Sequence, residues 1–142
     1  MNGVFVDSNV ILRHLGGDLR AKKIVDLVEA GELRGYVNQV VVSEVFYIYI
    51  KLTTGMRSYG LKGKPEVVKQ VDVEPVYKVF SLFEELPGSF EITRIARNMM
   101  RDYGLLPNDA IIAATCKHYG IRRVATFDED FKRVDFLEIV KF

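Results

Sequence analysis

Short apolar runs alternate with longer apolar segments of helical spacing along this chain. The run "GVFV" at residues 3–6 is β-branched and aromatic, and turn-forming residues follow it, which predicts a strand. Runs of similar character at 89–93, 122–127 and 136–140 predict three more strands. The short segment 34–39 is ambiguous.

The first segment between these runs, residues 8–30, has residues typical of helix starts and ends. It follows residue 7, with Ser8 and Asn9 able to cap it, and extends in one or two pieces to about residue 30. The Gly-Gly-Asp sequence at 16–18 predicts a break, after which Asp18 caps the second piece and Gly31 ends it.

Later segments also have helical spacing. Residues 39–53 are apolar at nearly every angle of a helical wheel, which predicts a buried helix, although β-branched Val40, Val41 and Val42 leave a strand open for the first turn. Residues 54–65 have the composition of a loop, and two helical segments follow, up to residue 86, with Pro65 and Pro75 near their starts. The last two helices are predicted at 94–104 and from Pro107 to just before Gly120.

Alternating strands and helices favour an α/β domain with a mainly parallel central sheet flanked by helices. The chain has 142 residues, of which 49% are hydrophobic, enough for one sizeable core. We therefore expect residues 1–142 to form a single domain.

Composition excludes several classes of protein. The chain has 20 Lys and Arg residues against 19 Asp and Glu residues, which excludes a polybasic or acidic tail as its main means of binding a partner. This balance still allows a basic face. The single cysteine, Cys116, excludes a disulfide framework and a multi-cysteine zinc site. The longest apolar run, 40–50, is too short to span a bilayer, and no signal peptide is evident. We expect a cytoplasmic protein without a membrane partner.

Two acids follow predicted strands. Asp7 comes after the first strand, and Asp128 comes directly after "VATF". Ligands of open parallel sheets collect at the carboxyl ends of strands, so these acids would face one crevice if their strands are neighbours. Each acid also has an ordinary structural explanation, because Asp often begins a turn after a strand.

Two more acids lie against apolar sequence. Glu44 lies in the apolar helix of 39–53, where an unpartnered carboxylate is costly, so we expect either a salt bridge or a metal ion beside it. Asp109 opens the helix that starts near Pro107, a position the helix dipole favours by about 0.3–1 kcal/mol. The sequence "AIIAAT" after Asp109 nevertheless places this helix start against the core.

Four converging carboxylates would repel one another, and the chain offers no His or Cys cluster to neutralise them. A hard divalent cation with oxygen ligands, Mg²⁺ or Mn²⁺ rather than Zn²⁺, would do so. Such a site suits the hydrolysis of phosphodiester bonds. From the residues alone this is one interpretation among several.

Four motifs together resemble the PIN-domain ribonuclease family, especially its small VapC-like members, the toxins of type II toxin–antitoxin pairs. In chain order the motifs are "FVDSNVIL", "SEVFY", "LPNDAIIAAT" and "VATFDEDF". They extend from Asp7 to Phe131, nearly the whole chain, and their order and separations suit the family.

This resemblance implies a three-layer α/β/α fold and a Mg²⁺- or Mn²⁺-dependent endoribonuclease that cuts RNA. It makes four acids the metal-binding and catalytic quartet: Asp7, Glu44, Asp109 and Asp128. Asp130 is an additional acid that could share or take over the role of Asp128, and Ser8, Asn9 and Thr126 match the family's polar support of the site. The family likeness also suggests a homodimer and an antitoxin partner.

Basic residues offer candidates for RNA binding. Arg94, Arg97 and Arg101 share one face of a predicted helix, which is either a solvated face or a phosphate-binding stripe. Lys62 and Lys64 lie in a segment that is long for a compact member of the family. That segment, 54–75, is a candidate lid or partner surface.

Other functions compete with a toxin ribonuclease. The fold could serve as a non-catalytic RNA- or protein-binding module, although the intact quartet argues against it. The chain could also be a nuclease of RNA processing. A phosphatase with Asp7 as nucleophile is a third alternative, but haloacid-dehalogenase-like phosphatases carry a second Asp two residues later, and this chain has Asn9 there.

Overall fold

The computed structural model describes residues 3–142 and contains a five-stranded parallel sheet. Its strands are β1 (Gly3–Val6), β2 (Arg34–Val37), β3 (Glu84–Glu85), β4 (Arg123–Ala125) and β5 (Glu138–Ile139). They pair in the order β3-β2-β1-β4-β5, and each neighbouring pair is parallel. The predicted α/β class with a parallel sheet is confirmed, and the ambiguous segment at 34–39 supplies β2.

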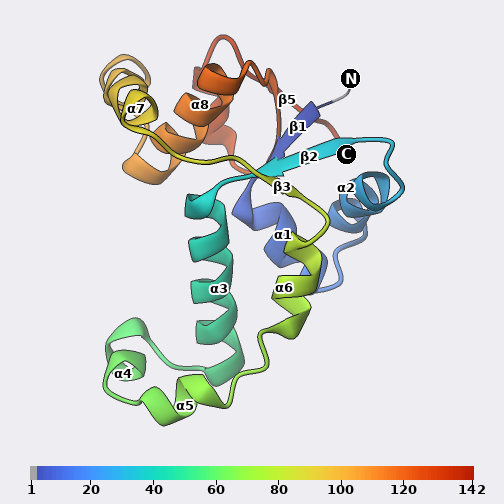
Figure 1. Cartoon of the computed structure of the whole chain (residues 1–142), viewed down its shortest axis with the longest axis vertical. Helices are drawn as coiled ribbons and strands as arrows, with labels where there is room; N and C mark the ends of the chain where they lie inside the picture. Colours follow the sequence, from blue (N-terminus) through green and yellow to red (C-terminus); the bar gives the residue numbers. More distant parts are fainter. Residues whose placement is uncertain (1–2) are drawn as a thin grey trace.

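Helices cover both faces of this sheet. They are α1 (Ser8–Leu15), α2 (Leu19–Glu29), α3 (Gln39–Thr54), α4 (Ser58–Lys62), α5 (Pro65–Lys69), α6 (Glu74–Phe80), α7 (Phe90–Tyr103) and α8 (Pro107–Tyr119), with a 3₁₀ helix η1 (Glu129–Arg133). Figure 1 shows α7 and α8 on one side of the sheet and α1, α2 and α6 on the other. The expected three-layer α/β/α arrangement is therefore present.

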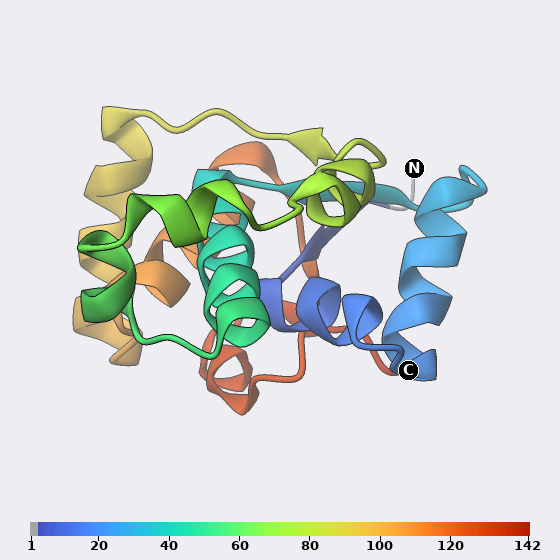
Figure 2. The ribbon, with the colours of Figure 1, turned by 90° about the horizontal axis from the view of Figure 1, so that it is seen from below.

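The long helix α3 extends away from the sheet, and α4 and α5 lie at its far end (Figures 1 and 2). The prediction of a buried helix is wrong, because only Val41 and Val45 of α3 are fully buried and Leu52 is 75% exposed. Only part of the helix packs on the rest of the molecule. The predicted loop at 54–65 is also corrected, since it contains α4.

The cap of α1 differs from the prediction. Asp7 is the N-cap and accepts a hydrogen bond from the Ser8 amide, so Ser8 and Asn9 lie in the first turn. The predicted break is confirmed, with Asp18 capping α2 through the amides of Arg20 and Ala21.

The predicted strand at 89–93 is wrong, because these residues begin α7. Ser89 is the N-cap, and its hydroxyl accepts a hydrogen bond from the Ile92 amide at 3.2 Å. Ile92, Ala96 and Met99 are buried at helical spacing, while Phe90 is 83% exposed. Helical burial of one face outweighs the β-branched character of "EIT".

The order of the strands determines where a ligand can bind. From β1 the chain adds β2 and β3 on one side, then crosses to add β4 and β5 on the other. The carboxyl ends of β1 and β4 therefore flank the topological switch point of the sheet, where open parallel sheets bind ligands. Cys116 is buried and unpaired, as expected for a core residue. Among residues 3–142, none of the helices has the length and apolar character needed to cross a membrane.

Candidate active site at the carboxyl ends of β1 and β4

Asp7 lies at the end of β1, where its buried carboxylate is held from three directions. Oδ1 accepts from the Ser8 amide at 2.7 Å. Oδ2 accepts from the Thr126 hydroxyl at 2.8 Å and from Asn9 Nδ2 at 3.3 Å. The Asp7 amide also donates to the Ala125 carbonyl at 3.0 Å, which ties the end of β1 to β4. The carboxylate is thus fixed in one orientation before any ligand arrives.

Thr126 and Asn9 connect the two strand ends. Besides donating to Asp7, the Thr126 hydroxyl accepts from the Asp128 amide at 2.9 Å and lies 3.2 Å from Asn9 Nδ2. Asn9 Oδ1 accepts from the Phe127 amide at 3.1 Å. One network therefore sets the position of Asp7 relative to the turn that carries Asp128.

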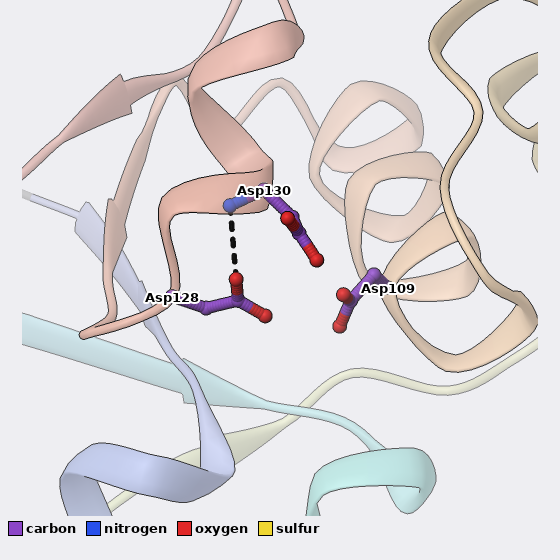
Figure 3. A group of neighbouring side chains, drawn as sticks. All are labelled: Asp109, Asp128 and Asp130. Carbon is purple, nitrogen blue, oxygen red and sulfur yellow. Dashed lines mark hydrogen bonds between the residues drawn. The ribbon is translucent and has the colours of Figure 1, made fainter.

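Three aspartates converge across the gap between η1 and α8 (Figure 3). Asp109, Asp128 and Asp130 each place a carboxylate oxygen within 4.8 Å of the other two. Asp128 is oriented by the Asp130 amide, which donates to its Oδ1 at 2.9 Å. Asp130 is exposed and forms an ion pair with Arg133 at 2.9 Å. Within residues 3–142 this is the one group of three metal-ligating side chains found at such separations, and Asp7 and Glu44 lie outside it.

The electrostatics extend the cluster to those two acids. Burial, together with the negative charges of four neighbouring acids, raises the pKa of Asp109 to about 7; burial is the largest cause, and the acids are Asp7, Asp128, Asp130 and Glu44. Burial likewise raises the pKa of Asp7, even though hydrogen bonds from Thr126 and Ser8 oppose the shift. Asp109 is therefore the acid whose pKa responds to the charges of all four of the others.

Glu44 reaches the same place from α3. Its side chain is half-buried, and burial together with the charge of Asp7 raises its pKa. A hydrogen bond with the Asn108 side chain partly offsets the shift. Sequence reasoning missed Asn108, although its place directly before Asp109 in "LPND" was a usable signal.

These acids form a donor set of carboxylate oxygens with one basic partner described above, Arg133 on the exposed Asp130. Clustered carboxylates with raised pKa values fit a hard divalent cation, which would remove the repulsion and accept several of the oxygens as ligands. Cys116 is buried in the core and takes no part in the three-residue group. The residues present therefore fit Mg²⁺ or Mn²⁺ better than a soft metal.

The basic residues singled out from the sequence lie elsewhere. Arg94 pairs with Glu91, and Arg101 pairs with Asp102 at 3.0 Å, so part of the predicted stripe on α7 is neutralised locally. Lys62 ends α4 and Lys64 precedes α5, at the far end of α3 from the acids (Figure 1). Arg97 is exposed on α7.

This chain is similar to known proteins along nearly its whole length. The family model described as PIN domain matches residues 4–137. Ribonuclease VapC2 of Methanocaldococcus jannaschii is 46% identical over 140 residues, which cover 99% of this chain and 94% of that protein. Ribonuclease VapC6 of the same organism is 35% identical over 149 residues, covering 99% and 97%.

A solved structure described as a toxin–antitoxin complex from Klebsiella pneumoniae has a similar fold, with a TM-score of 0.67 at 19% identity. The match covers 97% of this chain and 96% of that chain. The family match spans nearly all of the described residues, and the VapC2 match spans nearly the whole length of both proteins. This chain therefore belongs to the PIN-domain family, and VapC proteins are its relatives.

Proposed function

We propose that this chain is a metal-dependent endoribonuclease that acts as the toxin of a toxin–antitoxin pair. The observation that carries the proposal is the convergence of Asp109, Asp128 and Asp130 at the topological switch point, beside the carboxylate of Asp7. The relatives named ribonuclease VapC2 and VapC6 support the same activity. RNA is the substrate in this proposal.

The acids divide the work of the site. Asp7 and Asp109 would hold the metal ion, and Glu44 and Asp128 would be further ligands or would orient the attacking water. Asp130 is a further ligand, supported by its place in the group of three. Ser8, Asn9 and Thr126 act as positioning residues, since all three hydrogen-bond to Asp7.

Mg²⁺ or Mn²⁺ is the proposed cofactor, because carboxylate oxygens are the ligands both ions prefer. When bound, the ion lowers the pKa of a water, orients the scissile phosphate and offsets charge on the leaving oxygen. Neutralisation of the cluster also returns Asp109 to its charged form near neutral pH, so that its carboxylate is available as a ligand.

Protein partners follow from the toxin role. We infer a cognate antitoxin and a homodimer in the cytoplasm, where an unpaired thiol such as Cys116 stays reduced. An apolar groove of about 470 Å³ between α3 and α4 supports a protein partner at the predicted partner surface 54–75, since Tyr59 beside it is 96% exposed.

The alternatives are less well supported. A binding module without catalysis would have no use for acids whose charged forms are costly, yet Asp7, Glu44 and Asp109 all have raised pKa values. A phosphatase would need an acid at position 9, where Asn9 instead bridges Asp7 and Phe127. A processing nuclease would share the chemistry and differ in its RNA.

The test is RNA cleavage by the Asp109→Asn variant. We expect cleavage in Mg²⁺ or Mn²⁺ to fall at least about a hundredfold, and EDTA to abolish cleavage by the unaltered protein. Asp102→Asn is the matched control, because Asp102 is exposed on α7 and pairs with Arg101 outside the cluster. Full activity of Asp109→Asn, or cleavage that is insensitive to EDTA, would refute the proposal.

A further inference from the structure

A second pocket lies directly beside the acidic cluster. It has a volume of about 320 Å³ and lies between the first turn of α2, η1 and the end of the chain. Asp128 and Thr126 line it, so it shares two residues with the candidate active site. Figures 1 and 2 both place the end of the chain beside α2. The pocket therefore adjoins the residues that are proposed above to cleave RNA.

Phe127 lines this pocket together with Arg20, and Arg13 of α1, which does not line the pocket, contacts the same ring. The guanidinium of Arg13 lies 4.1 Å from the centre of its ring, and that of Arg20 lies 4.9 Å from it. Phe142 meets the same ring edge-on, at 4.8 Å between ring centres. The Phe127 amide is bonded to Asn9, which also bonds Asp7, so the aromatic platform and the catalytic acids share one rigid support.

Charges of both signs line the pocket: Asp128 and Glu129 are acidic, and Arg20, Lys132 and Lys141 are basic. Arg13 and Arg20 share a single carboxylate, that of Asp18, at 3.8 and 3.2 Å, and both guanidiniums remain about half exposed. Lys132 pairs with Glu129. Lys141 also lines the pocket, and within residues 3–142 it has no ion pair.

The guanidinium groups and aromatic rings of this pocket suit the binding of one nucleotide of single-stranded RNA. Guanidinium groups bind phosphate oxygens through charge-assisted hydrogen bonds, and bases stack on aromatic rings or on guanidinium planes. The acids of the cluster cannot bind a flanking phosphate themselves, because carboxylates and phosphates are both negatively charged. The basic side chains of this pocket, which Asp128 also lines, supply the attraction for phosphate that the acidic cluster lacks.

We propose that this pocket is a nucleotide subsite in which Arg20 and Arg13 bind the RNA phosphate next to the scissile one, and Phe127 and Phe142 hold those guanidiniums in place. The subsite rests on the proposed ribonuclease function. It differs from the basic residues predicted from the sequence, since Lys62 and Lys64 lie at the far end of α3.

The experiment measures binding and cleavage separately. Binding of a fluorescently labelled, single-stranded oligoribonucleotide is followed by anisotropy in EDTA with the Asp109→Asn protein, so that cleavage does not interfere with the measurement. Adding Arg20→Gln should raise the Kd about tenfold. It should also reduce the slope of log Kd against log salt concentration by about 0.7, the value for one phosphate contact on a single strand. In the otherwise unaltered protein, Arg20→Gln should raise KM more than it lowers kcat.

Lys23→Gln is the matched control. It removes one positive charge from the same helix, but Lys23 lies three residues from Arg20 and outside the pocket, so neither Kd nor the salt slope should change. Arg20→Lys, which keeps the charge and loses the planar group, should fall between Arg20→Gln and the unaltered side chain.

The outcomes separate the two proposals. If Arg20→Gln binds RNA as Lys23→Gln does, or if the Asp109→Asn protein binds no oligoribonucleotide, the subsite is refuted. If binding depends on Arg20 and the unaltered protein fails to cleave RNA, the pocket is an RNA-binding site, and the ribonuclease proposal fails together with the assignment of a scissile phosphate beside the pocket.

Discussion

Thr126 shows how much one hydroxyl can organise. It donates to Asp7, a residue 119 positions away in the chain, and accepts from the Asp128 amide. Resemblance to a family motif identified Thr126 as a supporting residue. The hydrogen bonds show how it acts, because a single oxygen satisfies groups from two strand ends that only the folded chain brings together.

Thr126→Val tests this arrangement, since it keeps the shape of the side chain and removes the hydroxyl. We expect RNA cleavage to fall about tenfold, and the free energy of unfolding to fall by about 1–2 kcal/mol, because Asp7 loses a donor and the Asp128 amide loses its acceptor. Cleavage assays and urea unfolding measure the two effects. Thr126→Ser keeps the hydroxyl and should retain most of both properties; a fully active valine variant would contradict the assigned role.

Single residues also mark what sequence could not supply. Asp130 was an extra acid with an open role, and the structure places it in the group with Asp109 and Asp128. No local sequence pattern links Arg13 and Arg20 to Phe127, although both guanidiniums lie over its ring in the folded protein. Their relevance depends on side-chain positions after packing.

At the scale of elements, α7 shows a local pattern that misleads. The β-branched residues of "SFEIT" predict a strand, but Ser89 caps a helix whose buried face is Ile92, Ala96 and Met99. The helical spacing continues through residue 103, so the longer pattern was the reliable one.

Ser89→Ala should lower the free energy of unfolding by about 1 kcal/mol, because the Ile92 amide loses its hydrogen-bond acceptor at the start of α7. Urea denaturation followed by circular dichroism measures the change. Ser43→Ala is the control, since Ser43 is exposed inside α3 and caps no helix, so its replacement should leave stability unchanged or slightly higher. Equal effects of the two substitutions would count against the cap.

The helix α3 illustrates a second limit at this scale. Apolar residues on all sides of a helix are compatible with burial in the core or with a partner protein. The sequence favoured the core, whereas the structure leaves Leu52 exposed and forms an apolar groove beside Tyr47 and Tyr59. The apolar pattern predicts that the helix surface is covered, but it does not distinguish the protein's own core from a partner protein.

The charge of the acidic cluster belongs to the whole molecule, because several elements contribute to it. In the metal-free protein the pKa of Asp109 is about 7, against 3.8 for an ordinary Asp. The folded state therefore holds this proton more tightly than the unfolded chain does. The resulting stabilisation is complete below pH 3.8 and is lost as the pH rises through about 7.

We accordingly expect the Tm of the protein in EDTA to fall by a few degrees between pH 5 and pH 8, with solvent screening limiting the effect because Asp109 is only half-buried. Mn²⁺ should restore the Tm at pH 8, since a cation that binds only the folded state stabilises it. Thermal unfolding followed by circular dichroism measures both.

Asp109→Asn isolates the contribution of this one group from other titrations, including that of His14, whose lowered pKa acts in the opposite direction. The variant should be more stable than the unaltered protein at pH 8 in EDTA, and its Tm should depend less on pH. An unchanged pH dependence of the Tm would show that the titration of Asp109 does not cause the loss of stability at high pH.

The sequence by itself determined the α/β class, the break at 16–18, the start of α8 near Pro107 and the positions of Asp7 and Asp128 at strand ends, because these depend on apolar spacing and turn residues within a few positions. Only the tertiary structure decided that β1 and β4 are neighbours, that Asp130 joins Asp109 and Asp128, and that Arg13 and Arg20 meet at Phe127. Those relations join residues far apart in the chain, and packing of the sheet against its helices brings them together.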